Sequence, residues 1–210
     1  MTPVSIVALF PLLVPPRHLL LGDLQEAHRV LARVPDPVPG VAAIGVRTEP
    51  LTDENGVFEA GAAHLGARVA DAKLFPGVTL LHEVGHALDY CVLGAEQGWA
   101  SEGAHRTPTQ TAAWTAFETA AQQSVTGRLL QAAKREDLDT EMLAAYLLKP
   151  KELFARAFAQ YAVSCAPDSS LTGDIGRLAG RRPPQHWPDD DFAMLKHALQ
   201  GVLRAYGGGT

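Results

Sequence analysis

The segment of the chain best suited to chemistry is His82-Glu83-Val84-Gly85-His86, an H-E-x-x-H motif inside a run of apolar residues. On a helix, residues four apart lie about 40° apart around the axis, so both imidazoles project from one face toward a common point. Two imidazoles placed in this way can share one zinc ion. Glu83 follows the first of them, where it can act as a general base toward a water without ligating the metal. The motif therefore predicts a zinc site with His82 and His86 as ligands.

A catalytic zinc ion usually takes three protein ligands and keeps one position for water, so a third ligand is required. The metzincin continuation would place Gly at position 89 and His at position 92, but the chain has Asp89 and Val92, which excludes that arrangement. The best remaining candidate is Glu152, in the first turn of a helix that we expect to begin at Pro150. Arg156, one turn later, can bind a carboxylate or a backbone carbonyl beside it. The alternative is that Glu152 is an ordinary carboxylate at a helix N-terminus.

Two blocks taken together, Thr79–Tyr90 (TLLHEVGHALDY) and Pro150–Tyr161 (PKELFARAFAQY), resemble the large polyvalent protein-associated domains of phage and mobile-element proteins. Those domains are similar to zincin metallopeptidases of the glutamate-ligand (gluzincin) type and, more distantly, to the lethal-factor-like and Pro-Pro endopeptidase group. The resemblance covers residues 41–165. It implies that His82, His86 and Glu152 are the ligands of zinc and that Glu83 is the base. The chain departs from the expected pattern at Lys149, where a Ser or Thr cap is expected, and this leaves the start of that helix open.

Further residues around the motif have two interpretations each. Tyr146 precedes Glu152 by six residues. It is a candidate donor to the oxyanion formed during hydrolysis, because the related endopeptidases have a tyrosine in a similar position. The other interpretation is an aromatic residue that packs between helices. Gly85 is unfavourable within a helix by about 1 kcal/mol relative to Ala, which predicts that another backbone approaches closely there. Asp89 either orients a ligating imidazole or an N–H of the partner helix, or is a surface or helix-end carboxylate. The other histidines, including His186, have no partner at metal-ligand spacing and are expected to be ordinary residues.

Composition limits the classes of partner and the compartment. The 210-residue chain is 47% hydrophobic and carries a net charge of −5, with a pI near 5.9, which argues against binding to nucleic acid or to an anionic membrane. Cys91 and Cys165 are the only cysteines. They are expected to be two buried thiols in a reducing compartment, which favours a cytoplasmic location, although secretion or delivery into another cell stays open. The apolar segment Val4–Val14 lacks the features of a signal peptide and is too short to span a bilayer, so we expect a buried strand or an apolar arm.

The pattern of apolar residues predicts the elements that must position the site. Strands are expected at Val41–Arg47 and within Val57–Val69, the latter as an edge strand or hairpin with which an extended substrate could pair. Three prolines between Val34 and Gly40 indicate a boundary, with an N-terminal arm and helix in 1–40 and a zincin-like domain in 41–210. The predicted class is α+β, with a small N-terminal β-sheet, an active-site helix and a mostly helical C-terminal part. Helices are expected over 20–34, 78–92, 108–135, 138–148, 150–165 and 190–206, with a polar loop over 166–188.

Together these features predict a zinc-dependent metallopeptidase that hydrolyses peptide bonds in a protein or peptide through zinc-activated water, with Glu83 as general base. The alternative is a non-catalytic zinc-binding or partner-binding module of a mobile-element or toxin-system protein. Glu83 weighs against this alternative, because a structural zinc site has no use for a base beside its ligands. A third hypothesis is a regulatory zincin that cleaves a repressor or its own parent protein. Substrate, cleavage specificity and oligomeric state are left open.

Overall fold

The computed structural model describes residues 18–35, 45–49, 56–59, 66–70, 75–95, 97–104, 106–133 and 137–207. For 18–21 and for the three strands it describes the backbone only. The apolar segment Val4–Val14 and the predicted boundary before residue 41 lie outside the described residues, so both predictions stay untested. Among the described residues, no helix has both the length and the apolar character needed to cross a bilayer.

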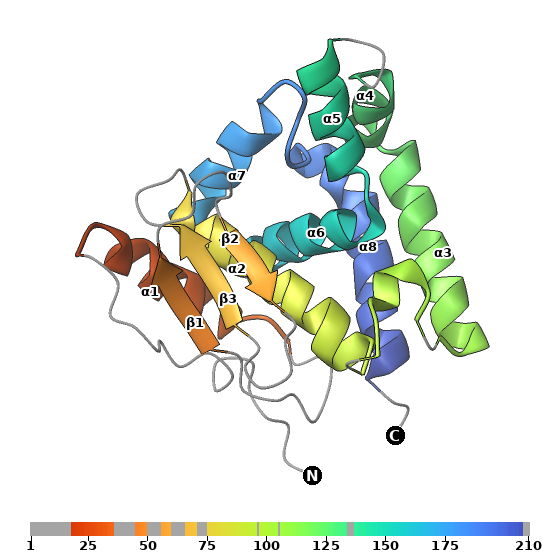
Figure 1. The fold of residues 1–210 in the computed structure, drawn as a ribbon, viewed down its shortest axis with the longest axis horizontal. Helices are drawn as coiled ribbons and strands as arrows, with labels where there is room; N and C mark the ends of the chain where they lie inside the picture. Colours follow the sequence, from red (N-terminus) through yellow and green to blue (C-terminus); the bar gives the residue numbers. More distant parts are fainter. Residues whose placement is uncertain are drawn as a thin grey trace.

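Helices dominate the described structure (Figure 1), making up 76% of the residues whose side chains are described. The sheet is small, with strands β1 (Gly45–Glu49), β2 (Gly56–Glu59) and β3 (Gly66–Ala70). The predicted α+β class is therefore wrong, and the fold is mostly helical. The helical elements are α1 (His18–Leu31), α2 (Pro76–Ala87), the π-helix η2 (Leu88–Leu93), the 3-10 helix η3 (Ala100–Glu102), α3 (Pro108–Gln123), α4 (Val125–Ala133), α5 (Leu138–Leu147), α6 (Pro150–Ser164), α7 (Leu171–Ala179) and α8 (Asp189–Tyr206).

The strand order corrects the prediction of a substrate-binding edge strand. The order is β1-β3-β2, with β3 parallel to β1 and antiparallel to β2. β2 and β3 therefore form the expected hairpin, but β3 is the central strand. Because both of its edges are already paired, β3 offers no free backbone groups to an extended substrate.

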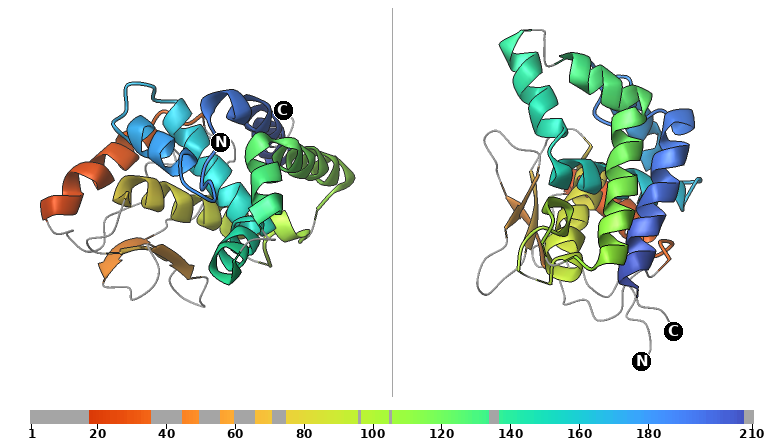
Figure 2. Two further views of the ribbon diagram at one scale, coloured as in Figure 1. Left: turned by 90° about the horizontal axis from the view of Figure 1, so that it is seen from above. Right: turned by 90° about the vertical axis from the view of Figure 1, so that its right-hand side faces the viewer.

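Helix α2, which carries the H-E-x-x-H motif, lies at the centre of the molecule. It lies between the sheet and α6 (Figure 2, left), and it contacts α1 and α7 as well. Ten of its residues, from Pro76 to Ala87, are buried. One hydrophobic core joins α1, α2, α3, α6, α7 and α8. The site helix is thus held on several sides, which fixes the direction of its side chains.

Two local differences from the predicted helices have identifiable causes. The long helix expected over 108–135 is broken at Ser124, whose backbone is extended. The carboxylate of Asp191 accepts hydrogen bonds from the backbone N–H groups of Val125 and Thr126 and so caps the second piece, α4. The expected loop over 166–188 contains α7, which buries Leu171, Ile175 and Leu178 along one face.

Candidate metal centre

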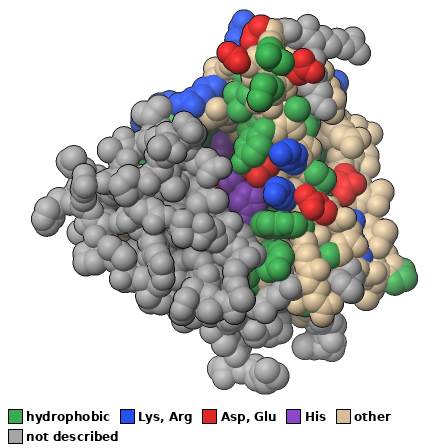
Figure 3. All heavy atoms as spheres, in the orientation of Figure 1, with side chains coloured by type: hydrophobic (Ala, Val, Ile, Leu, Met, Phe, Trp, Pro, Cys, Tyr) green, Lys and Arg blue, Asp and Glu red, His purple; other side chains and the backbone are tan. Residues whose placement is uncertain are grey.

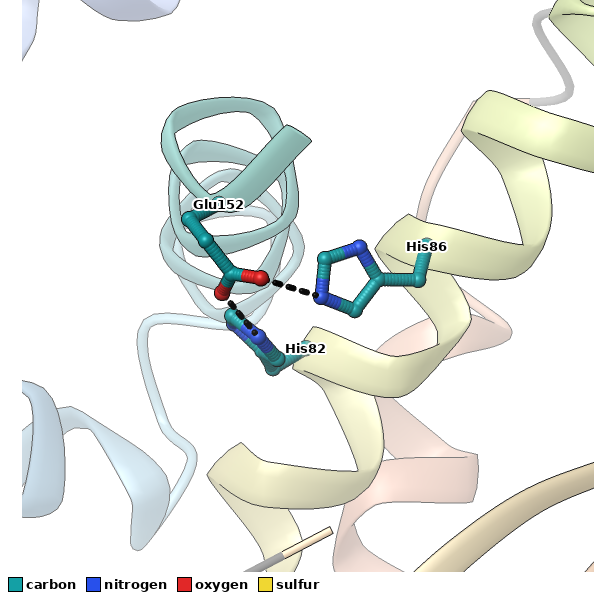
Figure 4. Close-up of side chains that lie close together, drawn as sticks. All are labelled: His82, His86 and Glu152. Carbon is teal, nitrogen blue, oxygen red and sulfur yellow. Dashed lines mark ion pairs between the residues drawn. The ribbon is translucent and has the colours of Figure 1, made fainter. Parts of the chain in front are cut away.

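Two helices carry the three side chains of the candidate metal centre (Figure 4). His82 and His86 lie one turn apart on α2, and their ring centroids are 4.6 Å apart with 87° between the ring planes. Their Nε2 atoms face the carboxylate of Glu152, which projects from the first turn of α6. That helix begins at Pro150, with Lys149 as an N-cap that forms no side-chain capping bond. The helical spacing thus places both rings on one face, as the motif predicts.

The distances between the ligand atoms suit a small coordination sphere. Oε2 of Glu152 lies 3.2 Å from Nε2 of His82, and Oε1 lies 3.4 Å from Nε2 of His86. A tetrahedral ion with bonds of about 2.0–2.1 Å holds neighbouring ligand atoms about 3.3–3.4 Å apart. The ligand atoms of all three residues lie within 4.8 Å of one another, so this group could hold a metal ion.

The donor set is compatible with a catalytic rather than a closed site. Within the described part of the chain, no fourth His, Cys, Asp or Glu joins the group. Three protein ligands leave a coordination position for water, whereas structural zinc sites usually have four protein ligands. The side chain of His82 is 19% exposed, so the centre is reached from the surface.

Gly85 allows the two site helices to approach each other. A Cβ atom at this position would lie 2.7 Å from Cα of Ala155 and 3.0 Å from its carbonyl oxygen. Such distances are far below ordinary carbon–carbon contact, so any side chain larger than hydrogen would force α2 and α6 apart. The predicted close approach of a second backbone at Gly85 is therefore confirmed.

The protonation states of the ligands favour metal binding. Burial is the main cause that lowers the pKa of His82 to about 4, so this ring is neutral near pH 7. Burial alone would raise the pKa of Glu152, but hydrogen bonds and charges from His82 and His86 outweigh it and hold that pKa well below its usual range. A neutral imidazole and an ionised carboxylate are the forms that ligate a metal ion.

A buried polar stripe on α6 ties the surrounding segments to the site. Glu152, Arg156 and Gln160 follow one another at intervals of four, and each is 3% exposed. Arg156 donates from Nη2 to the carbonyl oxygen of Leu147 (2.5 Å) and from Nη1 to that of Gln185 (2.9 Å). The expected role of Arg156 as a ligand of backbone carbonyls is thus confirmed. It holds the end of α5 and the segment before α8 against the helix that carries Glu152.

His186 is a neighbour of the centre that the sequence did not reveal. The next residue, Trp187, exchanges two hydrogen bonds with the amide of Gln160, at 2.7 and 3.1 Å. His186 is buried, and burial, followed by the charges of Arg156 and His82, lowers its pKa well below the usual value. Its Nδ1 atom is buried without a hydrogen-bond partner in the described structure. No local spacing marks this histidine, because a tertiary tether brings it to the site.

Aromatic and basic side chains border the histidines at the surface. The rings of His86 and Trp99 are 5.5 Å apart, and Nζ of Lys151 lies 4.9 Å from the Trp99 ring. Nζ of Lys149 lies 5.3 Å from the ring of Tyr146, which is 44% exposed. Figure 3 shows hydrophobic and Lys or Arg side chains beside the histidine surface. Tyr146 thus lies at the surface near the histidines, and its role stays a prediction.

The remaining predicted residues of the motif helix have distinct positions. Glu83 follows His82 on α2 and is 3% exposed; its role as a base stays a prediction. Asp89 is fully buried at the start of η2 and accepts hydrogen bonds from the backbone N–H (2.8 Å) and the hydroxyl (2.5 Å) of Ser101. Asp89 is therefore a carboxylate at the end of the motif helix, as one interpretation predicts, but it is not at the surface. It accepts a backbone N–H from η3 and joins the motif helix to that element. Burial raises the pKa of Asp89 to about 6, against the opposing effect of those hydrogen bonds.

The two cysteines are half-buried rather than buried, and neither forms a disulfide. Burial raises the pKa of the Cys165 thiol, which keeps it protonated near pH 7. Neither cysteine belongs to the His82, His86 and Glu152 group.

Comparison with known proteins adds no relative to this picture. No protein-family model, no curated protein and no solved structure matches the chain.

Proposed function

We propose that the chain is a zinc-dependent metallopeptidase in which His82, His86 and Glu152 hold the zinc ion. The observation that carries this proposal is the convergence of the three side chains, in which the two oxygens of Glu152 lie 3.2 and 3.4 Å from the Nε2 atoms of His82 and His86. Two imidazoles and one carboxylate are the donor set of several zinc peptidases, and one ligand atom from each of the three residues lies within 4.8 Å of the others. The resemblance of the two sequence blocks to zincin-like domains points to the same chemistry.

When bound at such a site, zinc lowers the pKa of water to about 7 and polarises a carbonyl group. The protein residues supply the remaining steps. Glu83 accepts a proton from the attacking water and returns it to the leaving amine. Tyr146, exposed at the end of α5, donates a hydrogen bond to the oxygen of the scissile carbonyl as negative charge develops on it. Arg156 keeps the end of α5 and Glu152 in register.

The substrate that we propose is a protein or a peptide, cleaved in the cytoplasm. The acidic net charge of −5 does not favour nucleic acid as a ligand. Neither of the two cysteines takes part in a disulfide, as is usual for a reducing compartment.

The proposal is tested by Glu83→Gln in the zinc-loaded protein, with a library of quenched fluorescent peptides as substrate. We expect this variant to keep one equivalent of zinc and to lose at least about 100-fold in cleavage rate, because the base is removed and the ligands are not. Asp190→Asn, at an exposed carboxylate on α8, is the matched control and should cleave at the wild-type rate. Cleavage by Glu83→Gln at the rate of the control would exclude Glu83 as the base.

A wild-type protein that binds zinc but cleaves no peptide of the library would instead support the non-catalytic zinc-binding module. Tyr146→Phe separates the role of Tyr146 from that of Glu83, because it should lower the rate of cleavage without changing zinc affinity or the pH at which the water is deprotonated.

A further inference from the structure

The helical hairpin formed by α4 and α5 exposes most of the large hydrophobic side chains on the described surface. Six such side chains are exposed, and five of them belong to this hairpin: Val125, Leu129, Leu138, Met142 and Tyr146. The sixth is Met194 on α8. The hairpin extends beyond the rest of the molecule (Figures 1 and 2). Contiguous exposed apolar residues of this kind mark interaction surfaces.

Helix α5 is apolar on two opposite faces, although only one of them is covered. Its inner face, with Ala144 and Leu147, packs against α4 in a small hydrophobic cluster separate from the main core. Its outer face carries Leu138, Met142 and Tyr146, which are 69%, 63% and 44% exposed. These three residues, here called the α5 stripe, follow one another at intervals of four and extend along about 12 Å of one helix face. A helix with apolar residues on opposite sides is normally buried on both, so the exposed side chains of Leu138 and Met142 offer apolar surface to a ligand.

The α5 stripe leads from the tip of the hairpin to the candidate metal centre. Burial is the main effect on the pKa of the Arg156 guanidinium and lowers it to about 10. Glu152 and Tyr146 oppose burial and raise that pKa, so Tyr146, the last member of the α5 stripe, lies near Arg156. Lys149 covers the ring of Tyr146, and Lys151 covers the ring of Trp99. Trp99 in turn contacts the ring of His86. Figure 3 shows hydrophobic side chains extending from the histidines over this part of the surface.

Charge differs between the two ends of the α5 stripe. The first turn of α5 carries Asp139 and Glu141, and the end near the histidines carries Lys149 and Lys151. We propose that the α5 stripe binds the polypeptide substrate of the metal centre, through bulky apolar side chains of the substrate over Leu138, Met142 and Tyr146 and an acidic side chain beside the two lysines. This inference rests on the proposed peptidase function for the identity of the occupant. The charges at the two ends give the substrate one direction on the surface.

The test uses zinc-loaded Glu83→Gln protein, which holds a substrate without cleaving it, and a phage-displayed library of random 12-residue peptides. Selected peptides are synthesised with a fluorophore, and their Kd is measured by anisotropy. We expect them to carry at least two bulky apolar residues and an acidic residue. Met142→Lys should raise the Kd by at least about 10-fold, because a buried apolar contact is replaced by a desolvated charge.

Met194→Lys is the matched control, because Met194 is 62% exposed and Met142 is 63% exposed. It should change the Kd by less than about 2-fold, and thermal unfolding of both variants should match that of the parent protein. Replacement of Lys149 and Lys151 by Glu should raise the Kd of the peptides that carry an acidic residue. Equal Kd values for Met142→Lys and Met194→Lys, or no peptide selected at all, would overturn the proposal.

Further measurements distinguish this proposal from the peptidase proposal and from dimerisation through the same surface. If wild-type protein cleaves peptides while Met142→Lys and Met194→Lys bind them equally, the proposed substrate surface is rejected and the proposed peptidase function is kept. If Met142→Lys weakens binding but the wild type neither binds zinc nor cleaves, the peptidase is wrong and the peptide surface stands. Light scattering tests a second copy as occupant: a dimer that Met142→Lys abolishes and Met194→Lys does not would contradict a substrate site.

Discussion

Gly85→Ala is the substitution that most directly changes the spacing of the two site helices. The added Cβ would lie 2.7 Å from Cα of Ala155, 3.0 Å from its carbonyl oxygen and 3.2 Å from its Cβ. Gly85 immediately precedes His86, and Ala155 lies three residues after Glu152. Because the contact involves the backbone of α6, no side-chain rotation relieves it, and the helices must separate by about 0.8 Å to reach an ordinary contact of about 3.5 Å.

That displacement is large on the scale of a coordination sphere. Carried in full to the ligands, it opens the separations of 3.2 and 3.4 Å to about 4.0 and 4.2 Å. Two bonds of about 2.05 Å span 4.1 Å only when they are nearly linear, and a tetrahedral ion cannot adopt that angle. Zinc affinity should therefore fall by at least about 10-fold, or about 1.4 kcal/mol. Overpacking costs about 1–3 kcal/mol in stability, and the better helix propensity of Ala returns about 1 kcal/mol.

Zinc affinity is measured by competition with a chromophoric chelator, and stability of the metal-free protein by urea unfolding. Gly201→Ala on α8 is the control, because no atom lies within 4 Å of the added Cβ. The control should keep wild-type zinc affinity and be more stable by up to about 1 kcal/mol. Wild-type zinc affinity in Gly85→Ala would refute the idea that the close helix contact sets the ligand spacing.

Two other predictions concern stability. Asp191→Ala should lower the free energy of unfolding by about 1–2 kcal/mol in urea titrations, because it removes the hydrogen bonds that cap the N–H groups of Val125 and Thr126. Asp190 is exposed, and Asp190→Ala should change the free energy of unfolding by less than about 0.5 kcal/mol. Burial raises the pKa of Asp89 from 3.8 to about 6, so the folded protein holds a proton that the unfolded chain releases between these values. The stability of wild type relative to Asp89→Asn should therefore fall by about 2.4 kcal/mol as pH rises from 4 to 7, and a constant difference would contradict the raised pKa.

The part of the site that depends on local spacing could be predicted from the sequence. His82 and His86 are four residues apart in an apolar run, and helical geometry alone then places them on one face. The helix with Glu152 begins at Pro150, as the sequence predicts, and the helix with His86 begins at Pro76, two residues before the predicted start. The choice of Glu152 needed more than spacing, since its distance in sequence from the motif follows no periodicity.

Features that depend on tertiary contacts could not be predicted. The break at Ser124 is stabilised by Asp191, and His186 reaches the centre through the bonds of Arg156 and Gln160 to its neighbours. The contacts of Asp191, Arg156 and Gln160 leave no local pattern. Ser124 itself does carry a local N-cap signal, because its hydroxyl accepts a hydrogen bond from the N–H of Gly127. Helix α7 also left a local pattern, with Leu171, Ile175 and Leu178 on one face, but the glycines within it obscured the pattern.

The central claim is that His82, His86 and Glu152 hold one zinc ion together with solvent. Zinc K-edge X-ray absorption of protein loaded with one equivalent of zinc tests it most directly. We predict only nitrogen and oxygen neighbours at about 2.0–2.1 Å, with the multiple-scattering signature of two imidazoles, and loss of bound zinc in Glu152→Ala. Sulfur at about 2.3 Å, or unchanged zinc binding in Glu152→Ala, would contradict the account.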